Sequence, residues 1–154
     1  MKLFCLLLLL IARSPKEYPD EETIRSLFKD AVNEKMKATE LVTYIDICKV
    51  TPISLGYRGA AKMLLAKFEL NVFKKYELFQ EGKNELENAI LWDSESVELR
   101  FIRFSCQTNA PWFLNYRCSL NRDKEILLHS ISQNSGTIES IRNQIISALT
   151  QSGN

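Results

Sequence analysis

The sequence predicts an all-α protein in which about seven helices pack as antiparallel pairs into an α-α stack. Apolar residues recur at spacings of three and four along most of the chain, and no segment alternates convincingly with the period of two that marks a strand. The five glycines and four prolines are few for an all-β fold with many turns. A length of 154 residues supports one domain of ordinary size, so residues 15–154 are interpreted as a single helical domain.

The first three helices follow one another closely in the N-terminal half. The first is expected over residues 22–33, with its apolar face at Ile24, Leu27, Phe28 and Ala31. The second is expected over residues 37–49, with one side formed by Leu41, Val42, Ile45 and Cys48. Thr51-Pro52 begins the third, because proline at the first helical position loses no hydrogen bond. This helix runs to about residue 68 along the stripe Tyr57, Ala61, Leu64 and Phe68.

Four more helices are expected in the C-terminal half. The fourth follows Asn71 and covers about residues 73–91, with Phe79, Leu86 and Ile90 aligned. Ser94 or Ser96 is expected to cap the fifth, which ends near Thr108. The sixth covers residues 122–133, and after a turn at 134–136 Thr137 caps the last helix, which carries Ile138, Ile141, Ile145 and Leu149. The residues that we place in the core are Leu64, Phe79, Leu86 and Phe101.

The N-terminus has the layout of a secretory signal peptide. Lys2 precedes a short apolar run from Leu3 to Ile11, which is too short to span a bilayer comfortably. We expect residues 1–14 to be removed and the chain to be exported to the periplasm or the extracellular space, with no membrane span in the mature chain. A cut after Ala12 is the other choice, because Pro15 disfavours cleavage after Ser14. The alternative to cleavage is an N-terminal membrane anchor.

Three cysteines remain after such cleavage, and their number is odd. Cys48, Cys106 and Cys118 show no Cys-x-x-Cys spacing, and the lone His129 has no second histidine with which to hold a metal. We interpret the three cysteines as buried small apolar residues. The alternative is a disulfide between Cys106 and Cys118 across the loop at Pro111, which an oxidising compartment would favour.

Residues 52–94 carry the spacing of a helical repeat. The second-helix pattern of a tetratricopeptide unit is matched by Gly82, Leu86, Ala89 and Ser94, with serine where proline is usual. The preceding helix contains small residues that let two helices approach closely, among them Gly56, Gly59 and Ala60. The segment resembles a tetratricopeptide-like (TPR-like) helical hairpin, although its loop at 69–75 is too long for the period of about 34 residues. The resemblance implies antiparallel helix pairs stacked in sequence and no particular ligand.

The whole chain also resembles an uncharacterised family of small secreted bacterial helical proteins. Two segments carry this resemblance, Gly56–Ala61 and Val97–Pro111. It implies export and a helical fold. No established activity accompanies that family, so the resemblance supplies no function for this chain.

Glu98 breaks the apolar pattern of the fifth helix. It lies within an arc formed by Val97, Leu99, Phe101, Ile102, Phe104 and Cys106. A carboxylate in such a position is costly unless it is paired. We interpret Glu98 as a buried carboxylate whose leading partner is Arg58, on the glycine- and alanine-rich helix expected to pack nearby. The alternative is a general acid or base with a shifted pKa.

The candidate binding residues lie on the rest of the fifth helix and in the loop that follows it. Arg100, Arg103 and Gln107 fall within about 60° of one another on a helical wheel. We interpret them as a solvated stripe, and the alternative is a site where two guanidiniums bind a carboxylate or a phosphate. The loop from Asn109 to Tyr116 is expected to fold its three aromatic residues over the helix ends, and the alternative is that they anchor a partner. Those aromatic residues are Trp112, Phe113 and Tyr116.

Charge and motifs favour a non-enzymatic function. The net charge of +1 gives no electrostatic case for nucleic acid. A nucleophile elbow, a phosphate-binding glycine-rich loop and a His-Glu-x-x-His motif are absent, so we assign no catalytic residue, metal ligand or cofactor. The first hypothesis is a secreted or periplasmic helical module that binds a protein partner. The second is an enzyme or small-anion-binding protein that uses Glu98 with Arg58, Arg100 and Arg103, which would require these four side chains to converge on a solvent-filled cavity.

Overall fold

A computed structural model describes residues 17–133 and 139–151. Within these ranges the chain forms seven α-helices and one 3-10 turn, and no strand. The helices are α1 (Glu21–Ala31), α2 (Lys35–Ile47), α3 (Pro52–Phe68), α4 (Val72–Trp92), α5 (Val97–Asn109), α6 (Leu120–Ser132) and α7 (Glu139–Gln151), and the 3-10 turn is η1 (Trp112–Leu114). The all-α fold predicted from the sequence is therefore confirmed for the described part. The proposed signal peptide lies outside the described residues.

Side-chain caps determine where most of the helices begin. Thr51 and Ser54 form a reciprocal capping box at the start of α3, where Pro52 occupies the first helical position. Asn71 caps α4, and Ser96, rather than Ser94, caps α5 by accepting from the backbone N–H of Leu99. The predicted turn at residues 134–136 and the predicted cap Thr137 lie outside the described residues.

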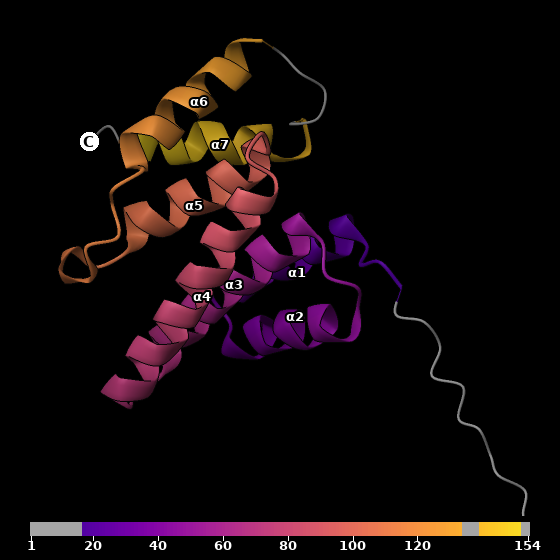
Figure 1. Cartoon of the computed structure of the whole chain (residues 1–154), viewed down its shortest axis with the longest axis vertical. Helices are drawn as coiled ribbons and strands as arrows, with labels where there is room; N and C mark the ends of the chain where they lie inside the picture. The colour runs from indigo at the N-terminus through magenta and orange to yellow at the C-terminus, as the bar shows by residue number, and fades with distance from the viewer. Residues whose placement is uncertain (1–16, 134–138, 152–154) are drawn as a thin grey trace, which may run out of the picture.

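A long antiparallel hairpin of α3 and α4 forms the centre of the molecule (Figure 1). Helices α1 and α2 pack against α3 on one side, while α5 packs across α3 and α4 and carries α6 and α7 on the other. The close approach within the hairpin depends on glycine. A Cβ built on Gly59 would lie 2.5 Å from the carbonyl oxygen of Gly82 and 2.9 Å from the amide nitrogen of Leu86, so only glycine fits at this contact.

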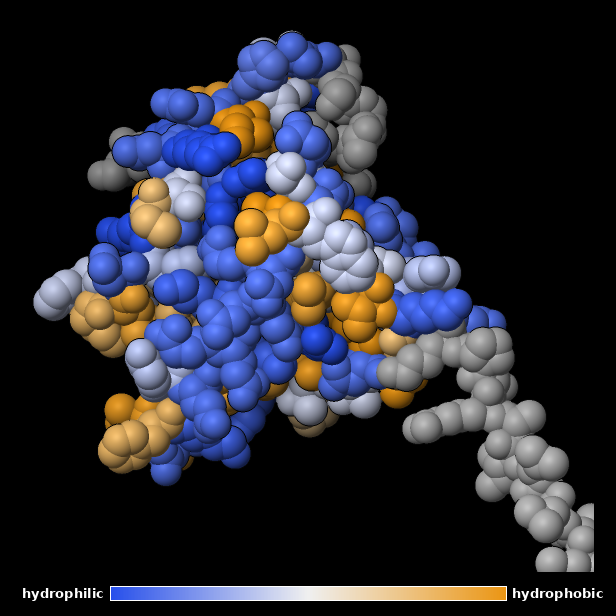
Figure 2. All heavy atoms as spheres, in the orientation of Figure 1, coloured by the Kyte–Doolittle hydropathy of each residue, from blue (hydrophilic) through white to orange (hydrophobic). Residues whose placement is uncertain are grey.

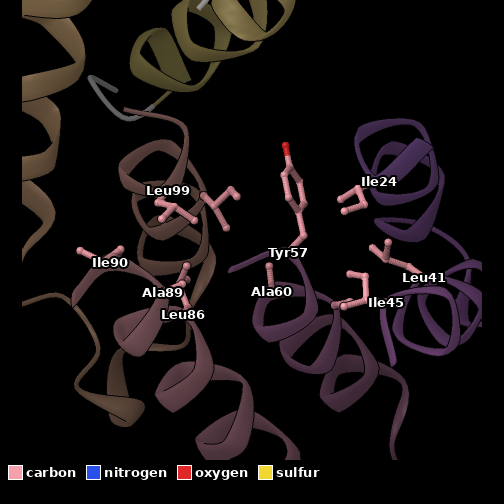
Figure 3. Packing of buried hydrophobic residues seen from close by; sticks show 11 residues of the cluster. Ile24, Leu41, Ile45, Tyr57, Ala60, Leu86, Ala89, Ile90 and Leu99 are labelled. Atoms are coloured by element: carbon pink, nitrogen blue, oxygen red, sulfur yellow. The ribbon is translucent and has the colours of Figure 1, made fainter. Parts of the chain in front are cut away.

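Three apolar clusters fill the spaces between the helices. The largest cluster contains side chains from all of the first five helices, α1 through α5. Within it, Tyr57 of α3 lies between the side chains of α1 and α2 and those of α4 and α5 (Figure 3). The second joins α5, α6 and α7 through Phe104, Leu127, Ile141 and Ile145. The third lies under the loop after α5 and contains Ala66, Phe79, Ala110 and Tyr116.

Of the four residues predicted to lie in the core, two are buried. Leu86 is fully buried and Phe79 is nearly so. Leu64 and Phe101 are only half-buried. Phe101 packs at the edge of the α5–α7 cluster, and Leu64 lies on the half of α3 that leads to the free end of the hairpin.

Candidate functional site

Arg100 and Arg103 are buried, which corrects the prediction of a solvated stripe. Their residues are only 8% and 5% exposed, and Gln107 on the same face of α5 is fully buried. The cause is the docking of α6, which covers the polar face of α5 instead of leaving it to solvent. Burial removes these three residues from any surface that a ligand could reach in this structure.

Asp123, from the first turn of α6, is the anion that these arginines bind. Its carboxylate has no solvent exposure and accepts from Arg103 Nε at 2.7 Å and Arg103 Nη2 at 2.8 Å, in a bidentate pair. Arg100 Nη1 lies 3.4 Å from the same carboxylate, and Arg100 Nη2 donates to the carbonyl oxygen of Ser94 at 2.9 Å. The alternative prediction of two guanidiniums holding a carboxylate thus describes the geometry, but the carboxylate belongs to the protein itself.

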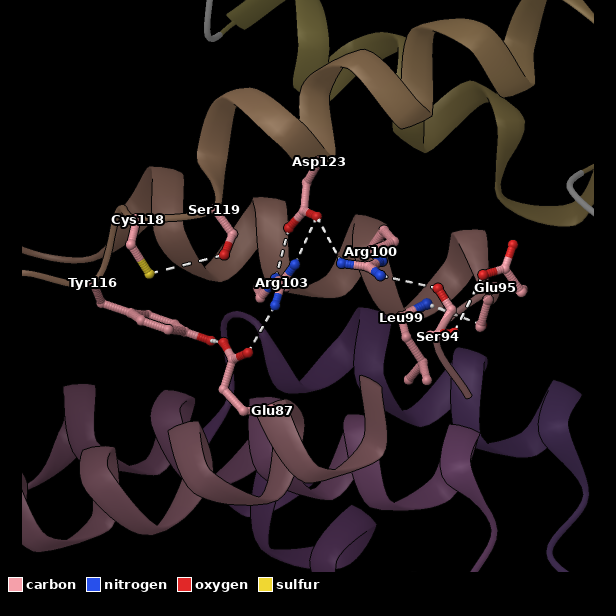
Figure 4. A network of polar contacts seen from close by, with 11 residues as sticks. Glu87, Ser94, Glu95, Leu99, Arg100, Arg103, Tyr116, Cys118, Ser119 and Asp123 are labelled. Carbon is pink, nitrogen blue, oxygen red and sulfur yellow. Dashed lines mark hydrogen bonds and ion pairs between the residues drawn. The ribbon is translucent and has the colours of Figure 1, made fainter. Parts of the chain in front are cut away.

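The network continues from Arg103 to α4 and to the loop after η1 (Figure 4). Arg103 Nη1 donates to Glu87 Oε2 at 2.7 Å, and the hydroxyl of Tyr116 donates to Glu87 Oε1 at 2.6 Å. Burial lowers the pKa of Arg103, but its bonds to Asp123 and Glu87 raise it more, so the guanidinium stays charged. Burial and the neighbouring Glu87 carboxylate raise the pKa of Tyr116, so its hydroxyl keeps the proton that it donates.

Gln107 is the least satisfied polar side chain of this region. Both its amide nitrogen and its amide oxygen are buried without a hydrogen-bond partner among the described residues, and the same holds for Nε of Arg100. The predicted role of Gln107 in a surface site is wrong because the amide lies inside the contact between α5 and its neighbours.

Glu98 is paired and largely buried, as predicted, but its partner is Arg25 and not Arg58. Arg25 on α1 donates to Glu98 from Nε at 2.8 Å and from Nη2 at 2.7 Å, and the hydroxyl of Tyr57 donates at 2.7 Å. The hydrogen bonds that Arg25 donates to Glu98 raise the pKa of Arg25, while burial and then the Glu98 charge raise the pKa of Tyr57. A tyrosine, a glutamate and an arginine therefore form the same kind of triad here as at Glu87.

Arg58 lies on another side of α3. Adjacent helical positions differ by about 100°, so Arg58 cannot share the direction in which Tyr57 reaches Glu98. It pairs instead with Asp46 of α2 at 2.8 Å and with Glu85 of α4 at 3.0 Å. Glu98, Arg58, Arg100 and Arg103 therefore belong to three separate ion-pair networks and do not converge on a cavity.

The loop after α5 presents two aromatic residues to solvent. Trp112 is 81% exposed and Phe113 is 67% exposed, so the prediction that they plug the helix ends is wrong for both. Their rings meet edge to face with centroids 6.2 Å apart. Tyr116 is 1% exposed and does plug the stack. The difference arises at Asn115, whose left-handed backbone (φ 47°) ends η1 and turns the chain inward.

Several contacts fix this loop to the helices. The ring of Tyr116 packs edge to face on Phe79 of α4, with centroids 5.9 Å apart, and Lys83 Nζ lies 5.1 Å from the Tyr116 ring centroid. Arg117 donates to the carbonyl oxygen of Ala110 across the base of the loop. Asn109, the remaining candidate, is exposed and donates to the carbonyl oxygen of Ser105 within α5. The exposed aromatic pair therefore stands on an anchored base.

The three cysteines in the described part of the chain form no disulfide. Cys48, Cys106 and Cys118 are free, so the alternative of a Cys106–Cys118 bond is wrong for this structure. Cys48 is buried and Cys118 is exposed, which corrects the expectation that all three would be buried. Burial raises the pKa of the Cys106 thiol to about 12. His129 is exposed on α6, and no cluster of three metal-ligating side chains occurs among the described residues.

A shallow groove of about 800 Å³ runs between α1 and α2. Its lining residues are Thr23, Leu27, Lys35, Met36, Thr39, Glu40, Thr43, Tyr44 and Ile47. Threonine and aliphatic side chains predominate, and no pair of carboxylates or cysteine–histidine pair faces it. The groove therefore offers mainly apolar surface, with Lys35 and Glu40 as its charged side chains.

Comparison with known protein families, with curated proteins and with solved structures gives no match for this chain. Among the described residues, no helix combines the length and the apolar character needed to cross a membrane.

Three charged residues that complete the networks around Glu98 and Arg103 were not identified from the sequence: Arg25, Glu87 and Asp123. Asp123 carried a signal that could have found it, because it lies three residues after Leu120 and four before Leu127, on the apolar face of α6. The same wheel argument that marked Glu98 applies to it. Arg25 and Glu87 lie among other charged residues of their helices and carry no such signal.

Proposed function

We propose that this chain is an exported, non-enzymatic helical module that binds a protein partner through the exposed aromatic pair Trp112–Phe113. One observation carries the proposal: Trp112 and Phe113 are largely exposed on a loop whose next aromatic residue, Tyr116, is buried and hydrogen-bonded. Large aromatic side chains in water have no stabilising role in the fold. On a rigid scaffold they are the residues most often found at the energetic centre of an interface.

The surroundings of the pair indicate the kind of partner. The neighbouring exposed residues Asn109, Pro111 and Asn115 are uncharged, so the loop suits an apolar pocket edged by hydrogen-bonding groups. Pro111 restricts the chain before it, and the Tyr116 anchor restricts the chain after it. Less conformational entropy is then lost on binding.

Export and a TPR-like hairpin belong to the same proposal. The signal-like sequence of residues 1–14 supports export, and the close antiparallel packing of α3 and α4 across Gly59 and Gly82 supports the likeness of residues 52–94 to a tetratricopeptide unit. The alternative function, an enzyme or a small-anion-binding protein that uses Glu98 with Arg58, Arg100 and Arg103, has less support. All four charges are paired inside the protein: Glu98 pairs with Arg25, Arg58 with Glu85, and Arg100 and Arg103 share Asp123.

The test compares Trp112→Ala with Trp92→Ala, a matched variant of another exposed tryptophan that is 60% exposed at the end of α4. The full chain, tagged at its C-terminus, is expressed in its source cells, and the captured proteins are quantified by mass spectrometry. We expect a stoichiometric partner that binds the wild type and Trp92→Ala but is lost with Trp112→Ala. With the purified partner, we expect Trp112→Ala to weaken binding by about 2 kcal/mol, or roughly 30-fold.

Two results would contradict the proposal. One is equal capture by both variants. The other is a drop in the free energy of unfolding of about 3–5 kcal/mol for Trp112→Ala, which would mark the residue as part of the core. The mass of the purified chain shows separately whether residues 1–14 are removed.

A further inference from the structure

The free end of the α3–α4 hairpin carries the two most exposed large apolar side chains of the described structure, Leu70 and Phe73. We name residues 67–76 the hairpin tip. Leu70 is 94% exposed, Phe73 is 87% exposed, Val72 is 73% exposed and Tyr76 is 57% exposed. Exposed apolar residues are ordinary when they are scattered, but a contiguous group marks a contact surface.

The hairpin tip is convex and stands away from the other helices. Tyr116 of the loop after α5 contacts α4 at Phe79, Lys83 and Glu87, so the first turns of α4 extend beyond these contacts. Figure 1 shows this end of the hairpin projecting from the molecule, and Figure 2 shows apolar side chains gathered on it. A projecting apolar end offers no concave surface in which a small ligand could bind. It can instead insert into a lipid bilayer or into a pocket of another protein.

Lysines surround the apolar residues. Lys67, Lys74 and Lys75 are exposed within the tip. The carboxylate of Glu69 accepts from the backbone N–H groups of Leu70 and Asn71, both at 3.0 Å, and its other oxygen lies 4.0 Å from Lys74 Nζ, so Lys67 and Lys75 are the lysines of the tip that it does not pair with.

Electrostatics at the tip favour anions. The pKa of Glu69 is lowered chiefly by the hydrogen bonds that it accepts from the backbone N–H groups of Asn71 and Leu70. The positive charges of Lys74 and, on α2, Lys35 lower it further. Glu77, one turn further along α4, is the remaining exposed carboxylate. Within and next to the tip, three exposed lysines, Lys67, Lys74 and Lys75, therefore outnumber the two carboxylates of Glu69 and Glu77.

We infer that the hairpin tip docks this protein on the surface of a bilayer that contains anionic phospholipids. Leu70, Val72 and Phe73 enter the boundary between the headgroups and the acyl chains, and the Tyr76 ring lies at headgroup level. The lysines extend their ammonium groups toward the lipid phosphates while their stems stay with the apolar residues. This docking is peripheral and uses a surface separate from the Trp112–Phe113 pair.

Charge argues against a second copy of the chain as the occupant. Two tips in contact would bring two sets of lysines together, which is unfavourable at close range. An anionic lipid surface instead supplies the opposite charge and an apolar layer at the same place. The combination of a convex apolar end with flanking lysines therefore favours lipid over a second tip.

The test measures partitioning onto vesicles by sedimentation. Large vesicles of phosphatidylcholine alone are compared with vesicles that also contain phosphatidylglycerol. The three core clusters lie within residues 17–151, so we use the chain from Pro15 onward, which also keeps the apolar residues 3–11 out of the assay. We expect binding to the anionic vesicles and much weaker binding to the neutral ones.

Matched variants locate the contact. Leu70→Ser with Phe73→Ser should reduce partitioning by roughly 30-fold or more. Leu91→Ser with Trp92→Ser, which removes two exposed apolar residues at the other end of α4, should leave it within about twofold. Lys74→Glu with Lys75→Glu should reduce partitioning roughly tenfold or more on anionic vesicles only. Circular dichroism and the melting temperature establish that each variant is folded.

Three results would overturn the inference. The first is no sedimentation of the wild type with anionic vesicles. The second is unchanged partitioning of the Leu70→Ser, Phe73→Ser variant. The third is a wild-type dimer in analytical ultracentrifugation that this variant converts to monomer without any lipid binding, which would assign the tip to a second copy. Each of these is independent of whether Trp112→Ala loses its protein partner.

Discussion

Replacing Asp123 with alanine removes the carboxylate that two buried guanidiniums share. Arg103 holds this carboxylate through two hydrogen bonds of 2.7 and 2.8 Å, and Arg100 Nη1 lies 3.4 Å from it. Breaking a buried ion pair from one side costs about 3–5 kcal/mol, because the remaining charge is left without its partner. Arg103 keeps Glu87 and Arg100 keeps the carbonyl oxygen of Ser94, so the lower end of this range applies.

We therefore expect Asp123→Ala to lower the free energy of unfolding by about 3 kcal/mol. For a domain of this size the melting temperature should fall by about 6–12 °C. Urea unfolding followed by circular dichroism at 222 nm measures the change, with an unchanged m-value as the check that the denatured state is the same. Glu125→Ala is the matched control, since Glu125 is exposed on the same helix, and it should change the stability by less than about 0.5 kcal/mol.

A loss below about 1 kcal/mol for Asp123→Ala would refute this reasoning, because it would mean that water reaches the two guanidiniums. A second variant tests the mechanism itself. Asp123→Leu combined with Arg103→Met replaces the buried pair with apolar side chains of similar size. It should recover part of the lost stability if the cost of Asp123→Ala comes from an unpaired charge, because Arg103 no longer carries one while Arg100 still lacks the carboxylate.

Three further predictions concern other parts of the fold. Gly59→Ala should destabilise by about 1–3 kcal/mol despite the better helix propensity of alanine, because the added Cβ would meet the backbone of Gly82; a stabilised variant in a thermal melt would contradict this contact. Glu98→Ala should cost about 1–3 kcal/mol, less than Asp123→Ala, because its arginine partner has other carboxylates within reach; an equal or larger loss in urea unfolding would count against that ranking. Iodoacetamide at pH 8 should label the exposed Cys118 and spare Cys106, whose pKa of about 12 leaves almost no thiolate, and rapid labelling of Cys106 in a peptide map would show that its burial is wrong.

Helical periodicity on α5 predicts the burial of Glu98 but not its partner. It identified Glu98 as a buried charge that needs a partner, and the structure confirms both points. It named the wrong arginine, because periodicity places a residue on the surface of its own helix and says nothing about which neighbouring helix faces that surface. Arg25 lies 73 positions away in the sequence, and only the packing of α1 beside α3 and α5 brings it to Glu98.

The same limit explains Arg100 and Arg103. Their side of α5 is polar in sequence, and polar sides usually face water. Here α6 covers that side and supplies Asp123, which pairs with both arginines. The polar side of α5 is therefore buried. Hydropathy also misplaced Trp112 and Phe113, which the geometry of η1 and the turn at Asn115 direct outward.

By itself, the sequence determined the helical class, the approximate bounds of the helices, the helix start at Thr51-Pro52, a serine cap on α5, and the close approach of helices at the small residues of α3. These follow from interactions between residues close together in the chain or from the volume of one side chain. Only the tertiary structure decided which charges pair, which polar face is covered and which aromatic residues reach solvent. Those outcomes depend on contacts between helices distant in sequence, where small differences in packing direction select one partner among several with similar chemistry.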